Sequence, residues 1–167
     1  MTTSAKQIAR AELADLSPQQ TEQVLGSDVS ACLAFVDVKG YPRQLPCWFL
    51  WYEGAFYITS TADKFHVRRL QADGRASICV EVTEVTPLKR ANRQVKGIGQ
   101  IEVFPDEEGA WGRRIQQKYL GEVQAPITGL GPVRVVLRMQ PDRLIAHGGG
   151  IFLSDDEAGN GESDGQA

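Results

Sequence analysis

Short runs of β-branched, aromatic and other apolar residues, separated by tight turns, follow one another through most of this sequence. Turn signals stand at Val38-Lys39-Gly40 and at Glu53-Gly54, and such spacing is typical of antiparallel strands. We expect strands over residues 31–37, 43–52, 55–60, 76–83, 95–104, 133–140 and 143–147. Helical periodicity replaces this pattern at residues 64–71 and 106–120. The sequence therefore predicts a mainly β fold, an antiparallel barrel with helical inserts.

The rest of the chain forms a segment at each end of this barrel. Residues 1–16 are polar and rich in Ala, which predicts an opening helix, and Ser17-Pro18 begins a second short helix that ends at Gly26. Residues 154–167 carry five acids and no Lys or Arg, a composition typical of disorder. We therefore predict a helical segment over residues 1–26, one domain over residues 27–153 and a disordered acidic tail over residues 154–167.

The net charge and the hydropathy of the chain argue against two classes of binding partner, nucleic acids and membranes. Without the five acids of the tail, the formal net charge changes from −3 to +2, which is not the strongly basic balance of a nucleic-acid binder. No apolar run approaches the roughly 20 residues of a membrane-spanning helix, and residues 1–16 lack the apolar stretch of a signal peptide. We predict a cytoplasmic protein that binds neither nucleic acid nor membrane.

Known catalytic and metal-binding motifs do not identify a reaction. Cys32, Cys47 and Cys79 lie in apolar strand-like runs without CxxC spacing, which predicts reduced core residues. His66 and His147 have no neighbouring cluster of Cys or Asp, so no metal site is expected. The sequence also contains no nucleophile elbow and no Walker sequence.

Residues 47–52 would be apolar on both faces of a strand. Alternation places two sets of three side chains on opposite faces: Cys47, Phe49 and Trp51 on one, and Trp48, Leu50 and Tyr52 on the other. One face can fill the barrel, so the other must be covered by a helix, a second subunit or a flat ligand. A dimer is the simplest of these explanations.

The densest group of polar residues lies at residues 59–70. Three hydroxyl residues, Thr59, Ser60 and Thr61, precede a predicted helix in which Lys64 and Arg68 share one face. Like charges four residues apart disfavour a helix unless an anion lies between them, and a phosphate would also accept from free N–H groups at the helix start. Asp63 is the expected N-cap. A solvated, positively charged helix face explains the same residues equally well.

In its order of motifs the chain resembles the pyridoxamine 5'-phosphate oxidase-like split barrel family, over about residues 17–150. The matching segments are DVKGYP at residues 37–42, LPCWF at 45–49, KFHVRRL at 64–70, RASI at 75–78, Gly97 and Gly99, and the stretch from Arg114-Ile115 to Gly121. Each segment is short, and the match rests on their order and spacing.

The resemblance implies an FMN-binding split β-barrel that forms a homodimer with two cofactor sites at the subunit interface. Thr59 and Ser60 would bind the cofactor phosphate, Lys64 would pair with it, and residues 45–48 would line the ring. The implied cofactor-binding residues are Leu45, Pro46, Cys47, Trp48, Thr59, Ser60, Thr61, Lys64, His66 and Arg69.

Two departures from the family pattern bear on activity. His66 stands where family members usually have Lys, and Arg143-Leu144 is followed by Ile145-Ala146 rather than by the proline-containing segment of true pyridoxamine phosphate oxidases. Vitamin B6 oxidation is therefore not expected. The resemblance instead implies an oxidoreductase that uses FMN, or alternatively coenzyme F420, to transfer a hydride to or from a flat conjugated small molecule. A non-catalytic protein that binds flavin or haem is the alternative.

Overall fold

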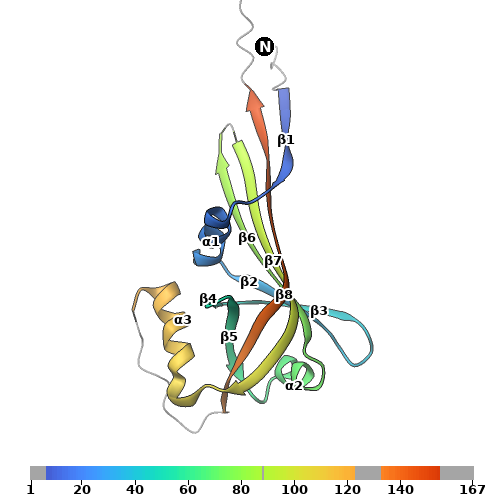
Figure 1. Cartoon of the computed structure of the whole chain (residues 1–167), viewed down its shortest axis with the longest axis vertical. Coiled ribbons are helices and arrows are strands. Elements are labelled where there is room, and N and C mark those ends of the chain that lie inside the picture. Colours follow the sequence, from blue (N-terminus) through green and yellow to red (C-terminus); the bar gives the residue numbers. More distant parts are fainter. Residues whose placement is uncertain (1–6, 88, 123–132, 155–167) are drawn as a thin grey trace, which may run out of the picture.

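A computed structural model describes residues 7–87, 89–122 and 133–154, and within these ranges the chain is dominated by one antiparallel sheet (Figure 1). Its strands are β1 (Gln7–Asp15), β2 (Ala31–Val36), β3 (Pro42–Cys47), β4 (Leu50–Tyr52), β5 (Ala55–Thr61), β6 (Arg75–Thr86), β7 (Lys89–Pro105) and β8 (Arg134–Ser154). Its helices are α1 (Pro18–Gly26), α2 (Phe65–Ala72) and α3 (Ala110–Leu120), the last preceded by a 3-10 turn over Glu107–Gly109. None of the described helices has the length and apolar character needed to cross a membrane.

The sheet follows the order β3-β2-β6-β7-β8-β5-β4, and β1 pairs with the far part of β8. Every pairing is antiparallel, which confirms the predicted mainly β architecture. The two strands predicted over residues 133–147 are one continuous strand, β8. A register shift between Ile98 and Gly99 on β7 leaves Asp142 of β8 as an extra residue without ending the ladder.

The predicted strand over residues 43–52 is interrupted at Trp48 and Phe49. β3 pairs with β2 at one edge of the sheet, whereas β4 pairs with β5 at the other edge. The chain therefore crosses between the two edges at these two residues. Phe49 is fully buried at the crossing, so its side chain fixes the crossing in the core.

The predicted opening helix is wrong for the described part of residues 1–16. Residues 7–15 form β1, in which Ala14 pairs with Gly148 and Asp15 with His147. The backbone of β1 hydrogen-bonds to the long strand β8, which is distant in sequence. Such long-range pairing cannot be predicted from local sequence, and it outweighs the helix propensity of these residues. The second helix is confirmed as α1, and Ser17 and Gln20 form a capping box at its start. Residues 155–167 of the predicted tail lie outside the described residues.

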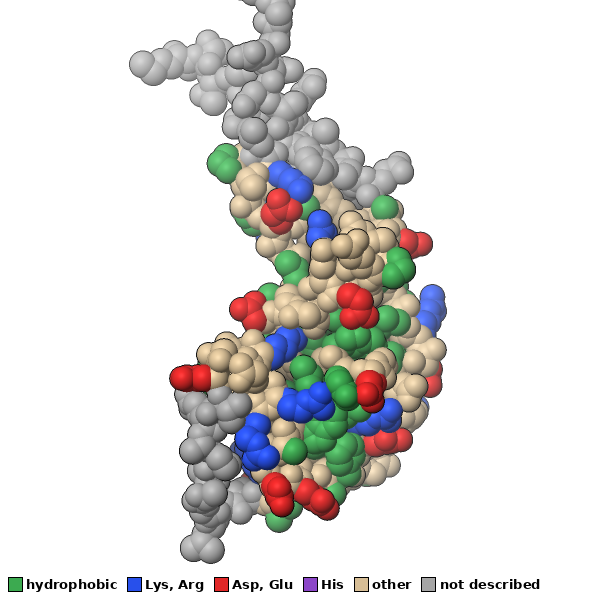
Figure 2. Space-filling model, turned by 60° about the vertical axis from the view of Figure 1, so that its left-hand side comes forward, with side chains coloured by type: hydrophobic (Ala, Val, Ile, Leu, Met, Phe, Trp, Pro, Cys, Tyr) green, Lys and Arg blue, Asp and Glu red, His purple; other side chains and the backbone are tan. Residues whose placement is uncertain are grey.

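The core lies on the inner face of the curved sheet. Phe56, Ile78 and Val95 belong to it, and α1 and α2 each add two buried residues. These are Val24 and Leu25 from α1, and Val67 and Leu70 from α2. Beyond this core, β1, β6, β7 and β8 extend as an arm (Figure 1). On the face shown in Figure 2, hydrophobic side chains gather over the half of the molecule below that arm, bordered by charged residues.

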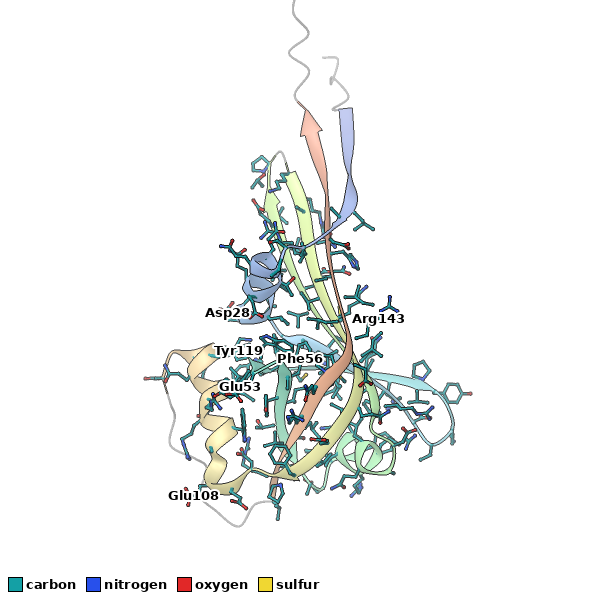
Figure 3. All side chains as sticks on the ribbon, viewed as in Figure 1. Asp28, Glu53, Phe56, Glu108, Tyr119 and Arg143 are labelled. Atoms are coloured by element: carbon teal, nitrogen blue, oxygen red, sulfur yellow. The ribbon has the colours of Figure 1, made fainter. Side chains whose placement is uncertain are left out.

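The helix α3 covers part of the second apolar face of residues 48–52. The Trp48 and Tyr119 rings stack at a centroid distance of 4.7 Å, and Tyr52 and Tyr57 both contact Trp111. Figure 3 shows Tyr119 at the end of α3 that faces α1. The helix is therefore one of the three covers that the sequence left open. Trp48 and Tyr52 remain 44% and 37% exposed beside it, and the dimer stays a prediction.

We predict that Gly97→Ala lowers the free energy of unfolding by about 1–3 kcal/mol, because an added methyl group overpacks this part of the core. A Cβ at this position would lie 2.7 Å from Cε2 of the fully buried Phe56 ring. Urea denaturation measures the change. Gly26→Ala is the control, because nothing lies within 4 Å of its Cβ position. Equal stability of the two variants would contradict this account of the β7 and β5 packing.

Candidate functional site

A pocket of about 360 Å³ lies where the end of β3, the end of β5, the first turn of α2 and one side of α3 meet. Its lining residues are Leu45, Pro46, Cys47, Trp48, Ile58, Thr59, Ser60, His66, Gly112, Ile115, Gln116 and Arg134. Seven of the ten residues implied by the resemblance are among them. The three that do not line this pocket are Thr61, Lys64 and Arg69.

One wall of the pocket is apolar and aromatic. Leu45 and Cys47 are half-buried and pack against the core, and Trp48 is 44% exposed. Burial, with the nearby Cys32 thiol, raises the pKa of Cys47 to about 12. The group therefore remains a neutral thiol at physiological pH and serves as apolar wall. All three cysteines are unpaired, as predicted, but none of them is a fully buried core residue: each is half-buried.

Another part of the pocket lining carries hydroxyl groups and an imidazole. The Ser60 hydroxyl lies 2.8 Å from Nε2 of His66, within hydrogen-bond distance. Burial and the positive charge of Lys64 lower the pKa of His66. At neutral pH His66 is therefore a neutral imidazole that hydrogen-bonds Ser60. It brings polarity to this wall without a permanent charge.

Arg134 is the cation that lines the pocket, and the sequence did not single it out. Its Nη2 donates to the Thr59 hydroxyl at 3.3 Å, and its Nε lies 4.0 Å from the carboxylate of Asp106. That buried carboxylate also accepts from the backbone N–H groups of Trp111 and Gly112. Asp106 therefore holds both the start of α3 and the guanidinium beside Thr59. Arg134 reaches this position through the pairing of β5 with β8, which no local motif encodes.

The two predicted cations of α2 have other environments. Arg69 donates from Nε to the Val36 carbonyl at 2.6 Å and from Nη2 to Asp73 at 2.8 Å, so its guanidinium joins α2 to the end of β2. Lys64 is exposed and is itself the N-cap residue, a position that the sequence had assigned to Asp63. The sequence placed the cations of the site on α2. In the structure, Arg134 of β8 lines the pocket, whereas Lys64 and Arg69 of α2 do not.

Two residues in the last turn of α3 fix the chain beside Trp48. The Tyr119 hydroxyl donates to the Val29 carbonyl at 2.9 Å and accepts from the Phe49 N–H at 3.2 Å. Lys118 Nζ donates to the carbonyls of Leu25 and Phe49 and lies 3.5 Å from the centroid of the Phe49 ring. These contacts tie α3 to the crossing between β3 and β4 and so position the aromatic wall.

Gln116 is the polar residue of α3 that lines the pocket. Its Oε1 is buried and has no hydrogen-bond partner among the described residues. A buried acceptor without a partner is costly, so a bound group with an N–H donor would satisfy it. The residues present thus fit a polar aromatic cofactor: Trp48 for its ring, Arg134 and hydroxyls for an anion, and Gln116 for a donor on the ring.

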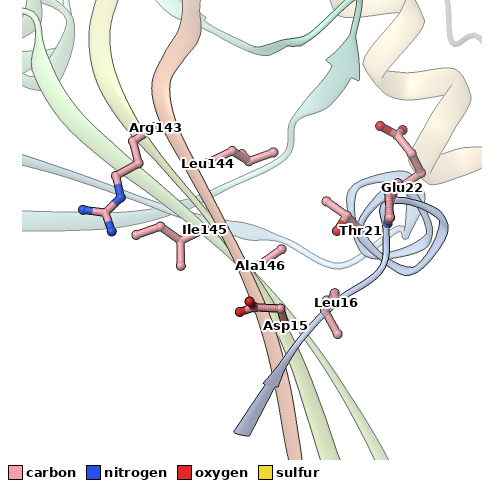
Figure 4. Close-up of a pocket in the computed structure, with 9 residues that line it drawn as sticks. Asp15, Leu16, Thr21, Glu22, Arg143, Leu144, Ile145 and Ala146 are labelled. Carbon is pink, nitrogen blue, oxygen red and sulfur yellow. The ribbon is translucent and has the colours of Figure 1, made fainter.

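A larger hollow of about 550 Å³ lies between the start of α1 and β8 (Figure 4). Its lining includes Asp15 and Glu22 on one side and Arg143 to Ala146 on the other. None of the residues implied by the resemblance lines it. Hydroxyls, an imidazole and a guanidinium converge only in the smaller of these two pockets, and convergence of polar groups in a largely apolar pocket is typical of ligand sites.

Comparisons with known proteins establish the fold. No protein-family model matches the sequence, and no curated protein matches it. Similar solved structures include a candidate 5-nitroimidazole antibiotic resistance protein from Bacteroides thetaiotaomicron, 12% identical, with a TM-score of 0.66 over 93% of this chain and 99% of that one. An F420 reductase is 23% identical, with a TM-score of 0.64 over 77% of this chain and 98% of that one.

A third solved structure is that of an FAD- and haem-binding protein from Mycobacterium smegmatis, 18% identical, with a TM-score of 0.57 over 86% of this chain and 73% of that one. These neighbours are split-barrel proteins of the pyridoxamine 5'-phosphate oxidase-like type. This chain has the split-barrel fold. The open order of the sheet agrees with that assignment, and the fold implied by the resemblance is confirmed.

We predict that Lys118 makes the stability of the split barrel depend on pH. Burial lowers the pKa of Lys118 to about 8 from its ordinary value of 10.5, so between these values the unfolded chain binds more protons. The contribution of Lys118 to the free energy of unfolding therefore rises with pH in this window. The difference between the wild type and Lys118→Met should increase from about pH 7 to about pH 9.5.

Denaturant unfolding of both proteins at several pH values measures this difference. Burial raises the pKa of Cys47 and of Tyr119 to about 12 each, but both groups are present in both proteins and cancel in the comparison. A difference that stays constant with pH would show that the Lys118 amine is not buried at the crossing.

Proposed function

We propose that the pocket between β3, β5, α2 and α3 binds a flavin or deazaflavin, FMN or coenzyme F420, and that the protein is an oxidoreductase acting on a flat conjugated small molecule. The observation that carries this proposal is the meeting of an aromatic wall at Trp48 with the Thr59 hydroxyl and the Arg134 guanidinium in one pocket. An F420 reductase and an FAD- and haem-binding protein with the same fold support it.

The two ends of the pocket suit the two ends of such a cofactor. The ring would lie against residues 45–48, where Leu45 and Cys47 are apolar and Trp48 offers a flat face. A phosphate would accept from the hydroxyls of Thr59 and Ser60 and pair with Arg134. His66 would add a neutral hydrogen-bonding group on the same side, and Lys64 would add long-range attraction from the start of α2.

The residues of the chain bind and orient, whereas the cofactor, when bound, supplies hydride transfer. Trp48 holds a ring in a fixed plane because Tyr119 stacks on its other side, and Tyr119 is itself fixed by the Val29 carbonyl. The neutral Cys47 thiol keeps this wall free of charge. Backbone N–H groups near Cys47 would steady the central edge of the ring.

We propose that the protein is a homodimer and that its partner closes the pocket. The support is the outer face of β2, β6 and β7. Cys32 pairs with Cys79, Ala34 with Ser77, and Ser77 with Ile98, so these side chains share one face, opposite the core residues that alternate with them. They form a small patch of short or apolar side chains, with Lys96 beside Cys79 and Arg143 beside Ile98 at its edge. Close approach of a second sheet is therefore expected at Ala34 and Ser77.

This patch lies next to the pocket and has no helix over it in the described part of the chain. The helices α1 and α2 bury their apolar residues in the core on the other face, and α3 packs on β4 and β5. Cys32 pairs on its other side with Pro46, which lines the pocket. A second subunit seated on this patch would therefore reach the ring end of the pocket, in agreement with cofactor sites at the interface.

We predict that Ala34→Arg converts the homodimer into a monomer, because two long charged side chains would be buried in the centre of the patch. Size-exclusion chromatography with light scattering measures the mass. Gln71→Arg, on the exposed surface of α2, should leave the dimer intact. A monomeric wild type at micromolar concentration, or a dimeric Ala34→Arg variant, would contradict this interface.

We predict that Arg134→Gln weakens binding of FMN or F420 by about ten- to a hundredfold, the usual effect of losing a charge-assisted hydrogen bond. Fluorescence or absorbance titration of the purified protein with each cofactor measures the affinity. Lys64→Gln, which removes a charge outside the pocket lining, is the matched control and should have a smaller effect. Absence of saturable binding of either cofactor would contradict the proposed function.

Non-catalytic binding of haem or flavin is the second candidate. It is favoured by the neutral imidazole of His66 at the pocket wall, since neutral imidazole is a common haem ligand. The visible spectrum separates the candidates: titration with hemin that gives a Soret band lost in His66→Ala would favour haem. Bound flavin or F420 that turns over with a hydride donor would favour the oxidoreductase.

A further inference from the structure

We propose that the Gln116 carboxamide recognises a lactam edge, an adjacent C=O and N–H, on the ring held in the pocket. The inference rests on the proposed function and adds a residue that determines which rings are accepted. The observation that carries it is a polar side chain at the pocket wall whose Oε1 is buried and has no partner among the described residues.

The orphaned acceptor is the reason to expect a ligand donor. Buried carbonyl oxygens in folded proteins nearly always accept a hydrogen bond, and an exception needs an explanation such as a missing ligand. The other α3 residues on this wall, Gly112 and Ile115, bring no polar side-chain group to the pocket. A bound ring with an N–H group would supply the donor that the described part of the chain does not provide.

The position of Gln116 along α3 places it between the two ends of the pocket. Gly112, four residues earlier, lies beside the Arg134 guanidinium, since an added Cβ there would lie 3.4 Å from Nη2. Tyr119, three residues later, stacks on Trp48. Residues three and four apart share a helix face, so Gln116 lies between the cationic end and the aromatic end. It therefore faces the ring portion of a ligand whose anion lies at Arg134.

A carboxamide offers an acceptor and a donor side by side, and the groups complementary to it are a donor and an acceptor side by side. The dione edge of an isoalloxazine or deazaflavin ring has this arrangement, with an N–H between two carbonyls. Haem has no such edge at its periphery, which carries carboxylates and apolar substituents. The residue thus favours flavin-type rings over porphyrins, and methylation of the ring N–H would remove the donor.

The experiment compares the affinity of the full-length protein for FMN and for FMN methylated on N3, by fluorescence titration. We expect the wild type to bind FMN at least tenfold more tightly. Gln116→Met, of similar size and without the amide, should bind the two ligands with equal affinity. Gln117→Met, the adjacent and exposed position on α3, is the control and should keep the wild-type preference.

The outcomes separate this inference from the proposed function. Saturable FMN binding by the wild type without discrimination against the methylated ligand would overturn the role of Gln116 and leave the proposed function standing. Failure of the wild type to bind either FMN or F420 would overturn both. The comparison of the two ligands on the wild type needs no variant, so poor folding of Gln116→Met would not prevent a decision.

Discussion

The last turn of α3 holds the chain at the point where it crosses from one edge of the sheet to the other. Tyr119 and Lys118 hydrogen-bond the N–H and the carbonyl of Phe49, and Tyr119 also stacks on Trp48. These contacts hold α3 against residues 48 and 49, and so position both the helix that covers part of the second apolar face and the aromatic wall of the pocket. The contacts of Lys118 and Tyr119 with residues 48 and 49 therefore contribute both to the fold and to the shape of the pocket.

The pocket is largely neutral, and its charge is set by one arginine. Burial keeps the Cys47 thiol protonated, and burial together with Lys64 keeps His66 neutral. Arg134, shared between Thr59 and the buried Asp106, is the permanent charge among its lining residues. A site of this kind favours an anion at one end and an uncharged aromatic ring at the other, which is the combination that a flavin-type cofactor presents.

Local patterns predicted most of the strands and the cluster of hydroxyls at the end of β5, because both depend on residues close in sequence. The proposed role of residues 45–48 came from the order of motifs that the chain shares with a known family. Arg134 and Gln116 could not be predicted, because the pairing of β5 with β8 and the packing of α3 bring them to the pocket. The same holds for β1, whose partner β8 lies more than a hundred residues away in sequence.

The central claim is that a flavin-type ring binds against Trp48. The chain has three tryptophans, Trp48, Trp51 and Trp111, and the pocket is lined by the first of them. The most direct test is a titration of ¹⁵N-labelled protein with FMN and with F420, following the three indole N–H resonances. The account predicts a large shift of the Trp48 resonance and small shifts of the other two. Saturation with either cofactor that leaves Trp48 unchanged would contradict it.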